Sequence, residues 1–185
     1  HTDYAGGRSI VTAADRGICM VAAARPDNTV RVMAGADREQ AVFAFEAETA
    51  PRPGHWSNYA ITVARRLARD FPGGLRGADI AFGSDLPIAA GMSSSSALLV
   101  ACYLAMAAVN ELPARAEYKA NIRSPEDLGG YLACVENGLA FSDFGSHHGV
   151  GTLGGSEDQT AITCCKPGKL SQYSYFPVTF EKLID

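Results

Sequence analysis

The stretch from Ala97 to Val109 constrains the fold more than any other, because it is apolar on every side of a helix. Residues 93–110 predict one helix, and a helix without a polar face must be buried in a core. The apolar run is too short to cross a bilayer, which needs about 20 such residues. A chain of 185 residues is long enough to bury it in a single domain.

The segments around this helix predict an α+β domain. We expect strands at residues 9–13, 18–23, 29–34, 40–45 and 78–82, and helices at 56–70 and about 124–140. A loop rich in Gly, Ser and His follows at 142–155, and two further strands are expected at 160–164 and 173–178. Strands that come first, followed by helices interleaved with strands, favour α+β over a repeating βαβ sheet.

Charge and cysteine content narrow the kinds of partner. The formal net charge is −4, and acidic and basic residues are interspersed without a basic block. This argues against nucleic acid and membrane surfaces, and favours a small molecule or another protein. Five cysteines without a C-x-x-C spacing favour neither a disulfide framework nor a zinc site. We therefore expect a cytoplasmic protein, with no signal peptide in the given sequence.

A serine-rich loop, LPIAAGMSSSSA at residues 86–97, leads directly into the buried helix. Small residues let the backbone approach a ligand, and the unpaired N–H groups at a helix start attract anions. Serine hydroxyls add donors for phosphate oxygens and possible ligands for Mg²⁺. No G-K-[ST] follows, so the loop is not a Walker A motif. The alternative is an ordinary helix N-cap with a serine-rich lead-in.

The serine-rich loop resembles the second motif of the GHMP kinases, which include galactokinase, homoserine kinase and mevalonate kinase. Three further segments resemble galactokinase motifs in the same order. HTDYAGG at residues 1–7 is similar to H-T-D-Y-N-G-G, and GSEDQ at 155–159 is similar to G-I-M-D-Q. WSNY at 56–59 is similar to W-x-N-Y. The set is more specific than any one motif.

This resemblance implies a fold like the second domain of ribosomal protein S5, with a mixed sheet and helices packed on one side. It implies that residues 1–185 form one GHMP kinase N-terminal-type domain that is truncated at both ends, without the C-terminal domain. It further implies ATP, Mg²⁺ and a monosaccharide as ligands. Since an Arg and a Glu usually precede the first motif, we expect the piece by itself to be a poor kinase.

The resemblance also assigns roles to residues. Asp3, with His1 beside it, would bind sugar hydroxyls, and the backbone of Gly155 would touch the sugar. Asp158 would face the anomeric hydroxyl, as a base or as an orienting group. Glu136 would hold Mg²⁺ together with Ser94 or Ser95. The ATP-binding residues would be Pro87, Gly91, Ser93, Ser94, Ser95, Ser96, Ala97 and, near the adenine, Trp56.

Each assignment has a simpler alternative. The first three residues would by default be a frayed terminus, and Glu136 a solvent-facing charge on a helix. Asp158 could be a turn or cap residue, and Trp56 a core residue. The adjacent His147 and His148 are expected to be loop residues rather than a metal pair.

The sequence departs from the family pattern beside the sugar. Ala5 replaces Asn, and Ser156 and Glu157 replace Ile and Met. Glu157, if it pointed inward, would raise the pKa of Asp158. Residues 142–154 look like an insertion over the mouth of the site.

We therefore expect a sugar 1-kinase with galactose as the first candidate. Arabinose or N-acetylgalactosamine kinases, a non-catalytic sugar and ATP sensor, and a mevalonate-type kinase are the alternatives. The sequence leaves the oligomeric state open.

Overall fold

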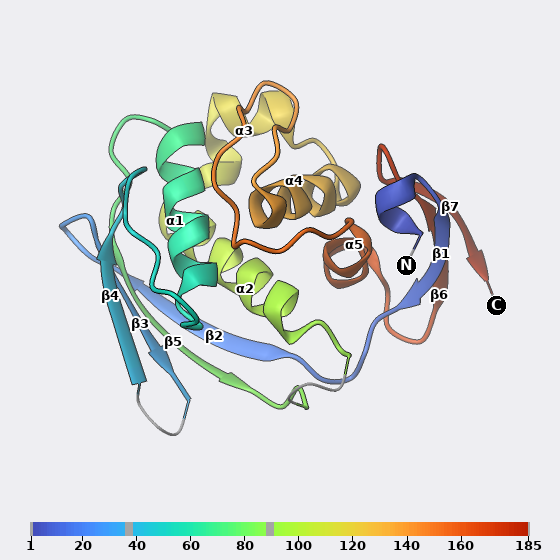
Figure 1. Cartoon of the computed structure of the whole chain (residues 1–185), viewed down its shortest axis with the longest axis horizontal. Coiled ribbons are helices and arrows are strands. Elements are labelled where there is room, and N and C mark those ends of the chain that lie inside the picture. The colour runs from blue at the N-terminus through green and yellow to red at the C-terminus, as the bar shows by residue number, and fades with distance from the viewer. Residues whose placement is uncertain (1, 36–38, 88–90, 185) are drawn as a thin grey trace. The chain divides into compact units, whose positions relative to one another are not determined.

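The computed structural model describes residues 2–35, 39–87 and 91–184. Contacts divide the chain into two compact units. Residues 16–119 form what we call the serine-loop unit, and residues 1–15 with 120–185 form the terminal unit. Each unit has its own sheet and its own helices (Figure 1). One domain over residues 1–185 stays a prediction.

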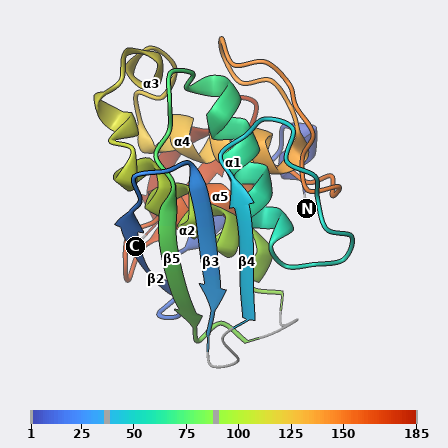
Figure 2. The same cartoon turned by 90° about the vertical axis from the view of Figure 1, so that its left-hand side faces the viewer.

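The serine-loop unit contains a four-stranded sheet in the order β2-β5-β3-β4. Its strands are β2 (Ile18–Ala24), β3 (Thr29–Ala34), β4 (Glu39–Ala44) and β5 (Ala78–Ser84). β3 and β5 run parallel and the other pairs antiparallel, so the sheet is mixed. The helices α1 (Asn58–Asp70) and α2 (Ser94–Val109) lie on one face of it (Figure 2). A short 3₁₀ turn, η2 (Leu112–Ala114), and the helix α3 (Ala116–Asn121) follow.

Alternation along the strands explains why the helices cover one face only. On β3, Val30 and Val32 are fully buried, whereas Arg31 between them is exposed. This period of two places alternate side chains on opposite faces of a sheet. α2 is buried over most of its surface, as its apolar sequence predicts. Leu104 is a large apolar residue of this helix that stays exposed, with 51% of its surface accessible, and the smaller Ser94 and Ala108 are exposed too.

The terminal unit contains a three-stranded antiparallel sheet and two helices. The sheet has the order β1-β6-β7, from β1 (Arg8–Thr12), β6 (Leu170–Ser174) and β7 (Thr179–Ile184). The short turn η1 (Asp3–Ala5) precedes β1, and α4 (Pro125–Asn137) packs against α5 (Glu157–Cys164). A Cβ on Gly129 of α4 would lie only 3.3 Å from the Cα of Thr160, so a glycine lets these helices approach closely.

The structure confirms the predicted α+β class, and most predicted elements lie within one or two residues of the observed ones. Residues 160–164 are an exception, because they belong to helix α5 and not to a strand. Their β-branched content favours a strand, but two acidic residues in the first turn stabilise a helix start. The threonine hydroxyls of Thr160 and Thr163 also bond to the carbonyls four residues earlier.

Two elements were not predicted, and one was placed wrongly. The final strand β7 and the short helix α3 have no counterpart among the predictions, and the strand predicted at 173–178 lies at 170–174. Among the helices that the structure describes, none is both long and apolar enough to cross a bilayer.

Candidate functional site

Asp3 lies in the turn η1 with only 4% of its surface exposed. Its Oδ2 accepts a hydrogen bond from the N–H of Glu157 at 3.1 Å, and its Oδ1 is buried without a partner. The turn itself is closed by bonds from the N–H groups of Ala5 and Gly7 to the carbonyl of Thr2. Residues 2–7 are therefore ordered and not frayed. His1, the other predicted sugar contact here, lies outside the described residues.

Gly155 allows the close approach that brings the first motif to α5. A Cβ at this position would lie 1.8 Å from Oδ2 of Asp3 and 2.8 Å from the N of Tyr4. No side chain fits there unless Asp3 moves. The predicted pair of Asp3 and Gly155 is thus brought together by the fold.

Asp158 is the second residue of α5 and is half-buried. It follows Glu157, whose main chain binds Asp3, so both motifs meet at the start of this helix. The N-terminus of a helix stabilises a carboxylate there. Asp158 is thus a first-turn acidic residue of α5, and its role toward a substrate stays a prediction.

Tyr175, which sequence reasoning did not single out, lies close to the same carboxylates. Its hydroxyl shares a 2.5 Å hydrogen bond with Oγ of Ser9, and its main-chain N–H donates to Gly7. Burial raises its pKa to about 12, and the negative charges of Glu157 and Asp3 contribute to this rise. Tyr175 therefore stays protonated at neutral pH.

Glu136, predicted as a metal ligand, lies near the end of α4 with 8% of its surface exposed. Its Oε2 accepts a 2.5 Å hydrogen bond from Nε2 of Gln159, a residue that is 2% exposed. The alternative of a solvent-facing charge is therefore wrong, since this carboxylate is buried. The sequence pattern includes Gln159 only as the last residue of the GSEDQ motif. Its Oε1 is buried without a partner.

The loop at 142–154 is fastened to the C-terminal end of α4. The N–H groups of His147 and Val150 donate to the carbonyls of Gly138 and Glu136, and the N–H of Gly154 donates to Oδ1 of Asn137. The loop thus leads from the helix that carries Glu136 to Gly155. Its position over a substrate stays a prediction.

His147 and His148 lie next to each other in the loop at 142–154. The rings of His147 and His148 are 5.5 Å apart between centroids. Over residues 2–35, 39–87 and 91–184, no group of three His, Cys, Asp or Glu side chains is arranged to hold a metal.

The serine-rich loop ends in a left-handed turn before α2. Gly91 has φ +73° and Ser93 has φ +48°, a conformation that non-glycine residues adopt only when the surroundings impose it. Ser93 occupies the N-cap position of α2 but makes no side-chain cap bond, so the N-cap alternative accounts for its position and not for its hydroxyl. Ser94 is exposed, Ser95 is half-buried and Ser96 is buried.

The predicted ATP-binding residues of this loop are only partly described. Pro87 is exposed before the turn and Ala97 lies in the first turn of α2. Residues 88–90 lie outside the described part of the chain.

Trp56 lies in the turn before α1, in the serine-loop unit. Its indole packs edge-on against Phe82 of β5, with 5.7 Å between ring centroids, and its Nε1 is buried without a partner. Asn58 closes the turn by two hydrogen bonds to the main chain of Arg52, at 2.6 and 2.7 Å. Asn58 of the WSNY segment thus holds the turn that carries Trp56.

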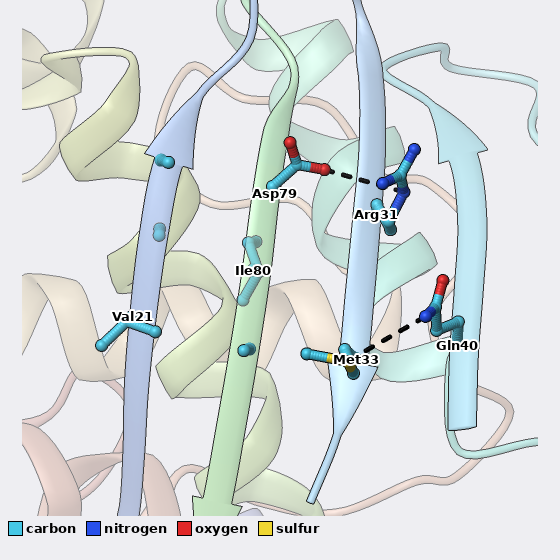
Figure 3. A pocket seen from close by; sticks show the side chains of 9 residues that line it. Val21, Arg31, Met33, Gln40, Asp79 and Ile80 are labelled. Atoms are coloured by element: carbon cyan, nitrogen blue, oxygen red, sulfur yellow. Dashed lines mark hydrogen bonds and ion pairs between the residues drawn. The ribbon is translucent and has the colours of Figure 1, made fainter. Parts of the chain in front are cut away.

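A hollow of about 400 Å³ lies elsewhere, on the face of the four-stranded sheet opposite the helices. Figure 3 shows Val21, Met33 and Gln40 on this face, and Arg31 across from Asp79 at 3.7 Å. Its lining is otherwise mostly alanine, and it contains none of the predicted site residues.

Known proteins resemble this chain in part of its sequence and in its fold. Residues 58–131 match the family described as "GHMP kinases N terminal domain". The chain is 38% identical to a galactokinase of Chloroflexus aggregans over 113 residues, which cover 60% of the chain and 28% of that protein. It is 41% identical to a galactokinase of Chloroflexus aurantiacus over 102 residues, 55% of the chain and 26% of that protein.

Solved structures show the same fold at lower identity. Lactococcus lactis galactokinase, solved with galactose, superposes with a TM-score of 0.73 at 22% identity, over 98% of the chain and 42% of that protein. Methanococcus jannaschii mevalonate kinase gives 0.71 at 13% identity, over 100% of the chain and 51% of that protein. The matches thus span about a quarter to a half of these relatives' lengths. The chain is thus similar to the GHMP kinases in part of its sequence and in its fold, and the relatives that it matches in sequence are galactokinases.

Proposed function

We propose that the protein is an ATP-dependent sugar kinase that phosphorylates the anomeric hydroxyl of a monosaccharide, with galactose as the first candidate. The observation that carries this proposal is the carboxylate of Asp3. One of its oxygens is fixed by the N–H of Glu157, and the other is buried without a donor. A buried acceptor without a donor is costly, and a hydroxyl of a bound sugar would supply the missing hydrogen.

The residues around Asp3 suit a sugar better than a single small ion. Gly155 lets the Asp3 carboxylate lie directly against the start of α5, because a side chain at this position would overlap it. Neutral Tyr175 lies close by without adding charge. The sugar would be bound by Asp3 and by the backbone of Gly155.

In the transfer step, the anomeric oxygen attacks the γ-phosphorus of ATP as the bond to the β-phosphate oxygen breaks. ADP leaves. If Asp158 is the base, it takes the proton of the hydroxyl; if Asp158 only orients the hydroxyl, the proton goes to solvent. Phosphoryl transfer depends chiefly on positioning and neutralisation of charge. The N-terminus of α2, with Ser94 and Ser95, would bind phosphate oxygens.

Magnesium suits the donor types that this chain offers. Glu136 offers a hard oxygen ligand in the terminal unit, and Gln159 fixes one oxygen of its carboxylate, as outer groups do for metal ligands. Ser94 and Ser95 offer hydroxyl ligands in the serine-loop unit. Each of the three is a candidate Mg²⁺ ligand within its own unit, and bound Mg²⁺ would neutralise charge on the phosphates. Trp56 would lie beside the adenine.

A different sugar is favoured by one observation. Glu157 stands at the start of α5, where its main chain binds Asp3, and it is half-buried. The galactokinase pattern has an apolar residue there, so the extra carboxylate would favour a sugar with another set of donors. Arabinose and N-acetylgalactosamine are therefore the second candidates.

The test is ATP consumption by the protein with galactose, arabinose, N-acetylgalactosamine, mevalonate and homoserine, for the wild type and Asp158→Asn. We expect turnover with one monosaccharide and a loss of about 10²–10⁴-fold in kcat in the variant, while sugar and ATP still bind by calorimetry. Binding of both without turnover on any sugar would favour the sensor. Turnover on mevalonate or homoserine would refute the sugar assignment.

A further inference from the structure

His55 connects strand β4 to the start of α1 through its two ring nitrogens. Nε2 lies 2.8 Å from Oε1 of Glu39, and Nδ1 lies 2.7 Å from Oγ of Ser57. The main-chain N–H of Ser57 also donates to Nδ1 at 3.1 Å. Because Nδ1 accepts, the neutral tautomer that satisfies both sides carries its proton on Nε2 and donates it to Glu39.

The imidazole also contacts the indole of Trp56. The two ring centroids are 5.4 Å apart and the planes are inclined by 32°. Phe82 meets the same indole edge-on at 5.7 Å. The indole is thus held by its contacts with His55 and with Phe82.

The indole is not satisfied as an ordinary core tryptophan would be. Its Nε1 is buried and has no acceptor. A buried tryptophan usually finds a partner for this N–H, so the missing one points to an acceptor that arrives with a ligand.

We propose that His55 is a positioning residue for Trp56. By bonding Glu39 and Ser57 at once, it fixes the indole in the orientation in which a nucleotide meets it. The inference rests on the proposed function, in which Trp56 contacts the base of ATP. Glu39 affects the indole only through His55. Removal of the Glu39 side chain should therefore weaken ATP binding only in proteins that keep the imidazole.

Trp56 is the only tryptophan of the chain, so intrinsic fluorescence reports on this ring alone. Emission and acrylamide quenching are measured without nucleotide, and then during titration with ATP and Mg²⁺. The variants are His55→Ala, His55→Gln, Glu39→Ala and the double variant His55→Ala/Glu39→Ala. Glu46→Ala, at an exposed carboxylate just after β4, is the matched control for Glu39→Ala.

We expect His55→Ala to make Trp56 more accessible to acrylamide and to weaken ATP binding about tenfold, the effect of one lost hydrogen bond with its contacts. Glu39→Ala should give a smaller change of the same sign, and the double variant should match His55→Ala. The Gln side chain can still reach Glu39, so His55→Gln should recover part of the affinity. Galactose affinity and far-UV circular dichroism should stay at wild-type values, as all readouts should in Glu46→Ala.

The proposal is overturned if His55→Ala has the quenching and ATP affinity of the wild type, or if the effects of Glu39→Ala and His55→Ala simply add. It is also overturned if galactose affinity falls equally, because the effect would then be a general loss of structure. A wild type that does not bind ATP refutes the proposed function instead, and the quenching comparison still tests the contact between His55 and Trp56.

Discussion

Gly155→Ala is the substitution whose effect follows most directly from the structure. The added methyl would lie 1.8 Å from Oδ2 of Asp3 and 2.2 Å from its Cγ, far inside the 3.4 Å of ordinary contact. Either Asp3 or the start of α5 must therefore move by more than an ångström. This movement would break the hydrogen bond from the N–H of Glu157 to Asp3.

The expected cost combines two effects. Overpacking at a tight site costs about 1–3 kcal/mol, and a lost hydrogen bond to a charged group costs about 1.5–3 kcal/mol. Because a moving carboxylate relieves part of the overlap, we expect about 3 kcal/mol in the free energy of unfolding. At about 2–4 °C per kcal/mol for a chain of this size, the Tm should fall by about 6–12 °C. If Asp3 binds the sugar, its displacement should also weaken galactose binding about 100-fold.

The assay is thermal unfolding together with calorimetric titration of galactose. The neighbouring Gly154→Ala is a close control, because a Cβ there meets nothing within 4 Å and its main-chain bond to Asn137 is kept. We expect Gly154→Ala to resemble the wild type in both measurements. If Gly155→Ala and Gly154→Ala were equally stable and bound galactose equally well, the reasoning about Asp3 would be refuted.

Three further predictions concern local features. Ser124→Ala removes the side chain that caps α4 by accepting from the N–H of Asp127, so urea unfolding should show a loss of about 1 kcal/mol; an unchanged value would contradict this. The guanidinium of Arg25 holds the pKa of Asp27 well below its usual range. This stabilisation is complete above the unfolded pKa of about 3.9 and is lost as the pH falls below it. The Tm of Asp27→Asn should therefore decline less below about pH 4 than the Tm of the wild type. An equal decline in both proteins would contradict the pairing of Asp27 with Arg25. Burial raises the pKa of Cys102 to about 12, so iodoacetamide should modify this thiol only after unfolding. Peptide mass mapping measures the modification, and a modified Cys102 in the native protein would refute its burial.

Short-range patterns in the sequence predicted much of the fold correctly. Alternation in β3 and the apolar character of α2 each depend on neighbouring residues, and both elements were predicted within a residue of their bounds. Helix α5 was wrong because the β-branched residues of 160–164 favour a strand when considered alone. Its packing against α4, with Gly129 close to Thr160, favours the helix and cannot be read from local preference.

The contacts of the candidate site join residues that are far apart in the chain. Asp3 binds the main chain of Glu157 across 154 positions, and Glu136 binds Gln159 across 23. Motifs identified most of the individual residues, but no spacing rule predicts which of them touch. The burial of Glu136 and the partnerless oxygen of Asp3 became visible only through the fold.

The most direct test of the proposed function is ³¹P NMR of the protein with ATP, Mg²⁺ and the monosaccharide that it consumes. We predict that the γ-phosphate of ATP appears as a sugar 1-phosphate, and that Asp158→Asn produces this signal at a rate lower by about two to four orders of magnitude. The proposed function would be contradicted if ATP and a sugar both bind but no sugar phosphate forms with any monosaccharide.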